Sequence, residues 1–529
     1  MNKKIFTKII SLILLLSSQT YATQDLYGKT FFSPRSQTAR SARRLVGQTP
    51  HMHKRKGEKC YATVAATAEY LRSYRERRLA EYFFGTDKLL FSGSQSTDRG
   101  STDILADYFG LSPEYRGTLK LNPHARTFVM DFNTYVGLDC WHPGLYFRLS
   151  LPVVSTRHWI CLEEDTLNAG NNAEYPAKYM TTDALAAPAK GPARYFEGDF
   201  TWGHVSEGIK FGKIGCARKT GVSDIWFTFG WNFLRRERGH FGFNLQMAAP
   251  TGSKPNGTYM FEPVVGNGDH WEFGVGFNGN ALLWESDVTR EIHMNIEANF
   301  THLFKATQCR TFDFKDEQRC RTTAFGENKF GSRFILLKEF DTAGQYTGTL
   351  IPAINKTTLA CKVSNALKID LTIMATYNDS NWVVDLGYNG WIRTKDKLCL
   401  CGSIEKNKYA LKGIQDVADT GADETQSNAT LTGNTLDTQT QAENADANQT
   451  FIATEDLDLC SATMPTSISH MLFAHASYTW DRELWEGVRP FLGVGFQLEF
   501  EGIRHSHYTA PDKNTMSNYG FWLKGGLEI

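Results

Sequence analysis

The chain has 529 residues and carries 57 basic residues (Lys and Arg) against 57 acidic ones, so its formal net charge at pH 7 is zero. A neutral chain lacks the basic field that attracts nucleic acid, which argues against a nucleic-acid-binding protein. Aromatic residues make up 13% of the chain, and there are 45 glycines. Such a composition occurs in soluble all-β proteins and in outer-membrane barrels, where only alternate strand residues face lipid.

The first 22 residues have the pattern of a secretory signal peptide. Lys3, Lys4 and Lys8 precede a largely apolar run over residues 9–16, and Ala22 ends a cleavage-site pattern. We therefore expect residues 1–22 to be removed on export. No later run reaches about 18 consecutive apolar residues, so no transmembrane helix is expected in the mature chain.

Residues 23–124 form a basic N-terminal segment whose fold the sequence leaves open. Residues 103–108 fit a short helix capped by Ser101 or Thr102, and residues 60–84 fit either a helix or a strand. The segment is a periplasmic extension, a plug inside a barrel, or an added hairpin of that barrel. If it folds inside, a group of its arginines would constrict the lumen: Arg72, Arg75, Arg77 and Arg78.

From residue 225 onward the chain alternates apolar and polar residues in a series of strands. Phe241, Phe243, Leu245 and Met247, for example, alternate with small or polar residues. Strands are also expected from residue 125, although none can be placed over residues 165–224. The motif GxGxxG at residues 274–279 falls inside one such strand, where its glycines occupy the non-aromatic face. A dinucleotide site would instead need a strand before the motif and a helix after it.

Short and long connections alternate along this series. The short ones are expected at 235–240, 286–289, 341–345, 378–381 and 481–486, and the long ones at 251–269, 305–331, 356–365, 395–468 and 502–517. This asymmetry is typical of transmembrane barrels, whose periplasmic turns are short and whose outer loops are long. Residues 125–529 are therefore predicted to form an all-β, antiparallel up-and-down barrel of about 14 strands, within a range of roughly 12–16.

The last strand, residues 519–529, places Tyr519, Phe521, Leu523, Leu527 and Ile529 on one face. It resembles the C-terminal assembly signal of Gram-negative outer-membrane β-barrels, with Ile529 where those chains usually end in Phe or Trp. The resemblance implies the outer membrane as the location. It also implies two partners, outer-membrane lipid and the barrel-assembly machinery.

Ten cysteines in an exported chain predict disulfides, mostly on the long-loop side. Cys309 with Cys320, and Cys401 with Cys460, are the pairings suggested by loop position. Cys399 and Cys401 could form half of a metal site, but no His or Cys pair sits at matching spacing, so disulfides are favoured. The other cysteines are Cys60, Cys140, Cys161, Cys216 and Cys361.

Other motifs give no positive sign of catalysis or of a cofactor. The HxH pairs at His51 and His53 and at His505 and His507 fit solvated loops better than metal sites. The chain has no HExxH, Walker or GxSxG motif. A carboxylate pair for glycoside hydrolysis has no fixed spacing, so it stays open. We predict no enzymatic activity, no cofactor and no metal.

Opposite the apolar strand faces lie ionisable residues that would point into the barrel. On a lipid face each would cost roughly 2–4 kcal/mol at the midplane, so their shared side predicts a polar interior. They line a water-filled pore of mixed charge and weak ion preference, or they pair across the lumen and brace the wall. These pore-lining candidates are Glu272, Glu297, Lys368, Asp370, Asp385, Arg393, Arg489, Glu499 and Lys524.

Two loops bear on function. Residues 402–467 are rich in Thr, Asn, Gln and Asp and are predicted to form a long, flexible outer loop. Residues 248–277 resemble the hairpin loop of barrel families that take up aromatic or fatty compounds, with Pro-Thr-Gly after one strand and Gly-Asn-Gly before the next. The polar interior argues against a hydrophobic cargo.

The leading hypothesis is an outer-membrane barrel that lets small hydrophilic solutes pass. A first alternative is a non-conducting surface barrel whose loops act in adhesion or host contact. A second is a secreted, soluble, disulfide-braced β-protein that could act as a hydrolase.

Overall fold

The computed structural model describes residues 28–38, 40–54, 60–93, 95–96, 100, 103–170, 174–175, 185–186, 189–203, 205–286, 290–315, 331–342, 346–412, 451–481, 487–501 and 515–529. The expected signal peptide, Cys320, His505 and His507 lie outside these ranges. Within them, no helix is both long and apolar enough to span a membrane.

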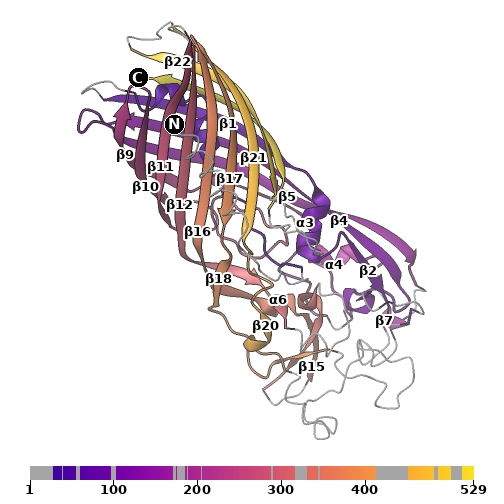
Figure 1. The fold of residues 1–529 in the computed structure, drawn as a ribbon. Helices are drawn as coiled ribbons and strands as arrows, with labels where there is room; N and C mark the ends of the chain where they lie inside the picture. The colour runs from indigo at the N-terminus through magenta and orange to yellow at the C-terminus, as the bar shows by residue number, and fades with distance from the viewer. Residues whose placement is uncertain are drawn as a thin grey trace, which may run out of the picture.

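Twelve antiparallel strands close into a barrel (Figure 1). The ring is closed because β1 pairs with β23 on one side and with β4 on the other, while β4 also pairs with β5. The barrel fold predicted from the alternating pattern is thus confirmed. The twelve strands are β1 (Tyr61–Ser73), β4 (Arg116–Gly137), β5 (Leu145–Asn168), β9 (Ile225–Arg236), β10 (Gly239–Ala249), β11 (Glu272–Ser286), β12 (Arg290–Thr311), β16 (Thr358–Asp379), β17 (Trp382–Arg393), β21 (Ser467–Thr479), β22 (Arg489–Glu501) and β23 (Asn518–Glu528).

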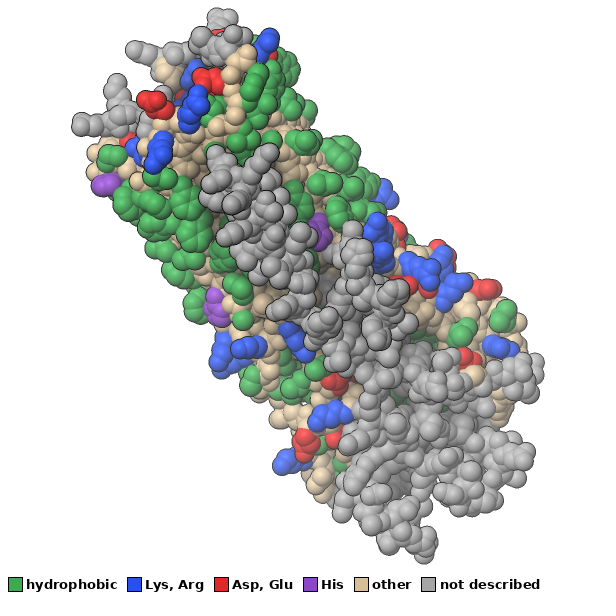
Figure 2. Space-filling model, in the orientation of Figure 1, with side chains coloured by type: hydrophobic (Ala, Val, Ile, Leu, Met, Phe, Trp, Pro, Cys, Tyr) green, Lys and Arg blue, Asp and Glu red, His purple; other side chains and the backbone are tan. Residues whose placement is uncertain are grey.

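The ring has an apolar outer face and a polar inner one. On β10, Phe243 and Leu245 are 40% and 45% exposed, whereas Asn244 and Gln246 between them are 1% exposed. Apolar side chains cover the barrel in Figure 2, and charged ones gather at its two ends and on the part beyond it. A belt of this kind is what a transmembrane barrel presents to lipid.

The count of twelve lies at the lower end of the expected range, and the central estimate of about fourteen is wrong for a structural reason. Residues expected to form a barrel hairpin around 341–345 are instead β14 (Leu336–Phe340) and β15 (Tyr346–Pro352), which form a separate sheet with β19 (Tyr409–Leu411). β8 (Cys216–Val222) pairs only with β5 and does not complete a barrel strand. One strand adds to the expected count, because β1 comes from the basic segment and joins the ring.

Shorter elements extend the barrel on its long-connection side. β2 (Lys88–Ser92) pairs with β4 and with β3 (Ile104–Leu105), and β18 (Asp396–Leu400) pairs with β16. These elements surround the largest apolar core, which includes Phe83, Phe109 and Phe334. The remaining elements are β6 (Glu174–Tyr175), β7 (Leu185–Ala186), β13 (Asp313–Phe314), β20 (Leu457–Asp458), α3 (Glu76–Phe84), α4 (Ala193–Phe196), α6 (Ile354–Thr357), η2 (Ala106–Phe109), η3 (Ser332–Phe334) and η6 (Thr454–Asp456).

One local prediction in this region is wrong, and a second, the flexible loop, is not tested. The helix expected over residues 103–108 is the short strand β3 followed by the 3₁₀ turn η2, because Ile104 and Leu105 pair with β2. The loop expected to be flexible over residues 402–467 contains β19, η6 and β20, whose apolar side chains are buried. Residues 413–450 of that loop lie outside the described part of the chain.

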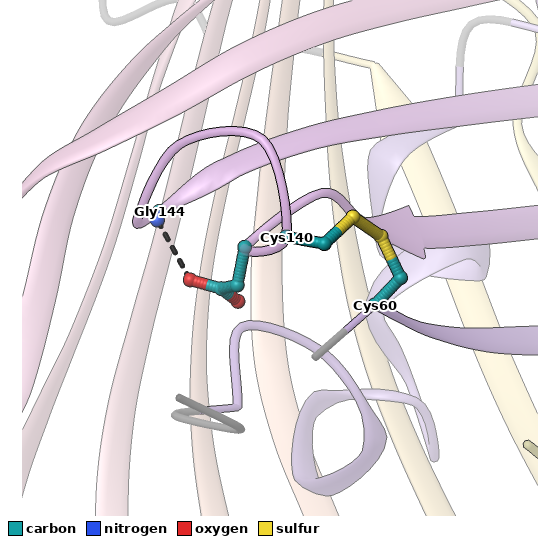
Figure 3. Close-up of a disulfide and its surroundings, with 4 residues drawn as sticks. Cys60, Cys140 and Gly144 are labelled. Carbon is teal, nitrogen blue, oxygen red and sulfur yellow. Dashed lines mark hydrogen bonds between the residues drawn. A yellow bond between two sulfur atoms is a disulfide. The ribbon is translucent and has the colours of Figure 1, made fainter. Parts of the chain in front are cut away.

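The cysteines also differ from expectation. Cys60 and Cys140 form a disulfide at the short-turn end, joining the start of β1 to the turn between β4 and β5 (Figure 3). Asp139 accepts a hydrogen bond from the Gly144 backbone N–H in the same turn, at 2.8 Å. The suggested Cys401–Cys460 bond is wrong because both are free thiols, as is Cys309. Cys401 is held beside β16 by its N–H to the Ala360 carbonyl, whereas Cys460 lies beyond β20.

Candidate functional site

Residues 28–54, hereafter the inner segment, begin on the long-connection side, where Thr30 binds the Ser461 carbonyl, and continue into the barrel lumen. The segment is described except for residue 39 and includes α2 (Ser41–Leu45) and the 3₁₀ turn η1 (Thr49–His51). Most of its residues are buried, although arginine, serine, threonine and glutamine dominate its sequence from position 33 to 44. Such a sequence has little apolar surface to bury. It is held by polar contacts with the inward-facing side chains of the wall.

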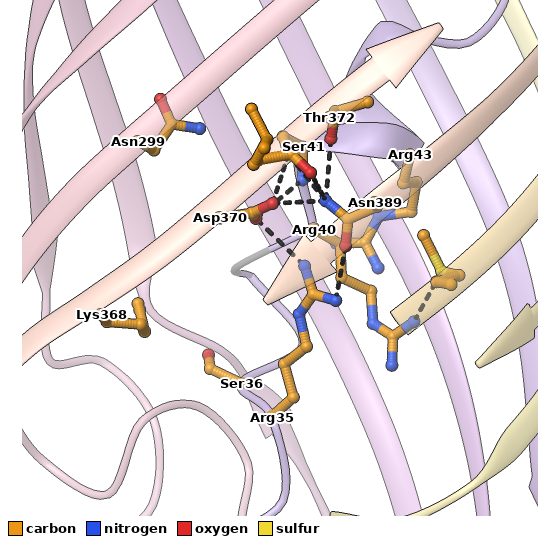
Figure 4. Close-up of polar contacts among 12 residues, drawn as sticks. Arg35, Ser36, Arg40, Ser41, Arg43, Asn299, Lys368, Asp370, Thr372 and Asn389 are labelled. Carbon is orange, nitrogen blue, oxygen red and sulfur yellow. Dashed lines mark hydrogen bonds and ion pairs between the residues drawn. The ribbon is translucent and has the colours of Figure 1, made fainter. Parts of the chain in front are cut away.

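Two arginines of the inner segment bind two carboxylates of the wall, and Figure 4 shows one of these contacts, between Arg35 and Asp370. Arg35 reaches Asp370 on β16 at 3.1 Å and Glu499 on β22 at 3.4 Å. Arg40 binds the other oxygen of Glu499 at 3.0 Å. Asn389 on β17 accepts a hydrogen bond from Arg35 and donates one to Asp370, so the carboxylate and the guanidinium share a common partner.

A second pair of arginines lies further along the same segment. Arg43 is fully buried and binds Glu69 on β1 at 2.5 Å and Asp131 on β4 at 2.9 Å. Arg44 lies 3.6 Å from Glu297. Buried charges of this kind are tolerated only when they are paired and hydrogen-bonded.

Backbone groups of the inner segment also bind the wall. Lys524 on β23 donates hydrogen bonds to the carbonyls of Arg43 and Arg44 at 2.9 and 3.1 Å, where a cation stabilises the end of a short helix. The N–H of Gly47 donates to Asp385 on β17 at 2.7 Å. Gly47 has a φ of +63°, and a Cβ there would lie 2.5 Å from the His475 ring, so only glycine fits.

The inner segment ends against the last residues of the chain. Glu528 accepts a hydrogen bond from His51 Nδ1 at 2.9 Å and pairs with Lys54 and Arg489. His53 packs between Tyr135 and Tyr146 and lies 2.9 Å from Arg148. Both histidines were expected in a solvated loop. They are instead enclosed by the barrel wall, where the segment carries them.

Eight of the nine pore-lining candidates are buried on the inner side of the wall. Five of them bind the inner segment directly: Asp370, Glu499, Glu297, Asp385 and Lys524. The other three pair elsewhere: Lys368 with Glu272, and Arg393 with Asp396 at 2.6 Å. Arg489 is the ninth candidate, and its side chain is 39% exposed at the short-turn end.

The four constriction candidates lie outside the lumen. Arg72 faces outward on β1, since the odd-numbered residues of that strand point inward. Arg75, Arg77 and Arg78 belong to the start of α3, which follows β1 on the long-connection side; Arg78 pairs there with Glu501. The arginines that fill the lumen are Arg35, Arg40, Arg43 and Arg44. No local sequence pattern distinguishes them from the four candidates.

Cavities remain at both sides of the inner segment. One of about 30 Å³ lies beside Phe32, Arg35, Arg40 and Trp391. A larger one, of about 350 Å³, lies at the short-turn end beside His53, Arg148 and Asn280. A third cavity, of about 10 Å³, lies beside Arg44, Gln48 and Asn133.

Comparisons with known proteins add little to this description. No family model matches the chain, and no curated protein matches its sequence significantly. Among solved structures it matches outer-membrane β-barrels. One is an outer membrane channel from Pseudomonas putida F1, at 8% identity, with 88% of this chain and 96% of that chain covered and a TM-score of 0.35. Another is a Pseudomonas aeruginosa FadL homologue, at 8% identity, 94% and 99% coverage and a TM-score of 0.28. A third is a deltaS2S3 mutant of the monoaromatic hydrocarbon channel TodX, at 7% identity, 88% and 90% coverage and a TM-score of 0.29. The strand pairing described above identifies the barrel, and these likenesses do not.

Proposed function

We propose that the protein is an outer-membrane channel for small hydrophilic solutes, closed by its own inner segment. The observation that carries this proposal is the set of buried ion pairs that joins Arg35, Arg40 and Arg43 to the wall. A barrel used only as an anchor could fill its interior with apolar side chains. This barrel keeps a charged wall and a separate charged segment that matches it.

The chemistry of these contacts allows the inner segment to leave. Ion pairs and hydrogen bonds to the wall can be replaced by bonds to water, because hydration recovers the desolvation cost of each charge. The exposed wall would then present acidic, basic and amide groups to a water-filled path. Such a lining suits polar solutes and gives weak ion preference.

A hydrophobic cargo is less compatible with this lining. Residues 250–271, which connect β10 to β11, contain the stretch that resembles the loop of aromatic and fatty-acid uptake barrels, and one structural match is a monoaromatic hydrocarbon channel. The lumen side of the neighbouring strands nevertheless carries Asn244, Gln246 and Asn299, all buried and hydrogen-bonded to each other or to Tyr146. An apolar solute would cover the amide donors and acceptors that these bonds do not use, such as Gln246 Oε1, at a cost in free energy.

The outer membrane follows from the apolar belt and from the asymmetry of the connections. We further propose export by residues 1–22 and insertion by the barrel-assembly machinery through β23. Lipid would contact outward side chains such as Phe243, Phe273 and Phe521, which are 40–54% exposed. A belt of this extent argues against the secreted soluble protein, and no enzymatic activity is proposed.

A non-conducting surface barrel is the second candidate. The filled lumen and the large folded part on the long-connection side favour it. In that case the barrel would anchor the outer part, and the inner segment would stay in place permanently.

Single-channel recording in planar lipid bilayers separates the two candidates. The double variant Asp370→Asn/Glu499→Gln removes both carboxylates that hold Arg35 and should increase the open probability over that of the wild type. The matched control Asp379→Asn lies on the same strand β16 but pairs with Arg290 at 3.3 Å at the turn. It should conduct like the wild type. If the double variant inserts and passes no current, the anchor is the correct function.

A further inference from the structure

The cavity of about 350 Å³ lies between the inner segment and strands β10, β11, β12 and β16. Its volume is in the lower range of small-ligand sites. Glu291 and Asn378 mark its outer limit, next to the short turns that follow β11 and β16. The cavity therefore lies at the end of the lumen where the connections are short.

The charged groups that line this chamber are already compensated by protein partners. Arg148 binds Glu297 at 2.9 Å, and Glu291 lies 2.8 Å from His293. Lys54 pairs with Glu528. A charged solute would have to compete with these partners, and the lining itself carries two basic side chains, Lys54 and Arg148, against two acidic ones, Glu291 and Glu297.

The uncompensated hydrogen-bonding capacity belongs to amides. Asn280 donates one hydrogen bond to Asn295 at 2.8 Å, and Asn295 donates one to Thr376 at 2.9 Å. A primary amide has two N–H donors and two acceptor lone pairs, so Asn295 keeps one of each. The carbonyl oxygen of Asn378 is buried with no hydrogen-bond partner among the described residues. The chamber thus presents both donors and acceptors to a ligand, on asparagine side chains held by the strands of the wall.

The inner segment supplies a different surface on the opposite side. Leu45, Pro50 and Met52 line the chamber with apolar groups. The rings of His53 and His240 lie 4.5 Å apart at its edge and provide flat faces. A ligand here would need hydroxyl groups toward the wall and C–H groups toward the segment.

We infer that this chamber binds a neutral, polyhydroxylated solute of mono- to disaccharide size. Each hydroxyl both donates and accepts a hydrogen bond, as the spare amide groups require, and a sugar ring has C–H faces that pack on apolar and aromatic groups. The inference rests on the proposed function, because the chamber would be the inner vestibule of the solute path.

Isothermal titration calorimetry on the full mature chain in detergent tests this inference, with maltose, gluconate and glucosamine as probes. Maltose should bind saturably and more tightly than either charged sugar. Asn280→Leu removes one lining amide at nearly constant volume and should weaken maltose binding about tenfold. The control Asn133→Leu changes a buried inward amide of β4 that does not line the chamber, and it should bind like the wild type. Thr376→Val gives a second test in case Asn280→Leu folds poorly, as judged by circular dichroism.

Three results would overturn the inference: no saturable heat with maltose, tighter binding of gluconate or glucosamine, or wild-type affinity in both chamber variants. The channel proposal and the sugar-site inference can each be overturned while the other stands. Current through Asp370→Asn/Glu499→Gln without maltose binding would remove the sugar site and keep the channel. Maltose binding without current in that variant would keep the site and remove the channel.

Discussion

Nη2 of Arg35 lies 3.1 Å from Oδ2 of Asp370, although 335 residues separate the two in the sequence. Each side chain is only 5% exposed. The contact joins the inner segment to the middle of β16 and places a guanidinium where an open channel would hold water. The position of the inner segment therefore depends on charges that neither partner could bury alone.

A covalent link at the same place should keep the lumen closed. Ser41 Oγ lies 2.7 Å from Thr372 Oγ1, so the side chains of Ser41→Cys and Thr372→Cys would point at one another. Added to Asp370→Asn/Glu499→Gln, the cysteine pair should abolish current when oxidised and restore it after reduction with dithiothreitol. Each single cysteine in the same background is the control, and it should respond to dithiothreitol no more than its parent. Undiminished current in the oxidised pair would show that solutes bypass the inner segment.

Gly47→Ala should loosen the inner segment without unfolding the barrel. A Cβ at this position would lie 2.5 Å from the His475 ring, and the left-handed φ of +63° adds strain of about 1–2 kcal/mol. Limited proteolysis should then cut residues 28–54 faster than in the wild type. Gly348→Ala is the matched control, because its φ is +81° but no atom lies within 4 Å of the added Cβ. Equal cleavage of residues 28–54 in the two variants would show that the His475 contact does not hold the segment.

Leu245→Arg tests the lipid-facing side of the ring. Leu245 points outward near the middle of β10 and is 45% exposed. An arginine at that depth should lower the free energy of unfolding in lipid vesicles by roughly 2–4 kcal/mol, measured by denaturant titration. Leu90→Arg provides the comparison, since Leu90 is 44% exposed on β2, outside the ring. A similar loss in both variants would contradict the assignment of the belt.

The part of the protein outside the ring should become more stable as pH rises. Burial lowers the pKa of Lys338 on β14 to about 8, below its ordinary value of 10.5. The unfolded state therefore binds more protons than the folded state between about pH 8 and 10.5, so stability rises with pH across that window. Below pH 8 both states are protonated, and the cost of burying the charge is present in full.

Hydrogen exchange over residues 336–340 measures this effect at pH 7.5 and 9.5, after correction for the intrinsic exchange rate. The wild type should gain protection at the higher pH, by at most about tenfold per pH unit. Lys338→Met removes the titrating group and should show no such gain. An equal gain in the variant would assign the effect to another group.

The wall of the barrel could be predicted from sequence, because a strand between lipid and a polar lumen must alternate. Residues 241–247 show this alternation and form β10 as expected. The same pattern misled at residues 336–352, where a small sheet on the apolar core also buries one face. At β1 the sequence does not distinguish a strand from a helix, because Ala62, Ala66 and Ala68 face outward and give a weak apolar signal.

The contents of the lumen could not be predicted in the same way. The inward position of eight charged residues could be predicted from the alternation along each strand, since residues two apart share a face. Their partners in the inner segment come from a region without periodicity, and no local pattern distinguishes Arg43, which is buried, from Arg77, whose side chain is 73% exposed. That difference is set by tertiary contacts, since the carboxylate partners of Arg43 are 26 and 88 residues away and Asp370 is 335 residues from Arg35.

Glu528 gives the order of assembly a physical basis. The residues it binds, His51 and Lys54, are made early, whereas Glu528 is the penultimate residue of the chain. It also lies on β23, whose pairing with β1 closes the ring. The short-turn end of the inner segment thus has no complete anchor until the seam between first and last strands has formed. Pairing of β23 with β1 therefore closes the barrel wall and, in the same step, completes the anchor at this end of the inner segment.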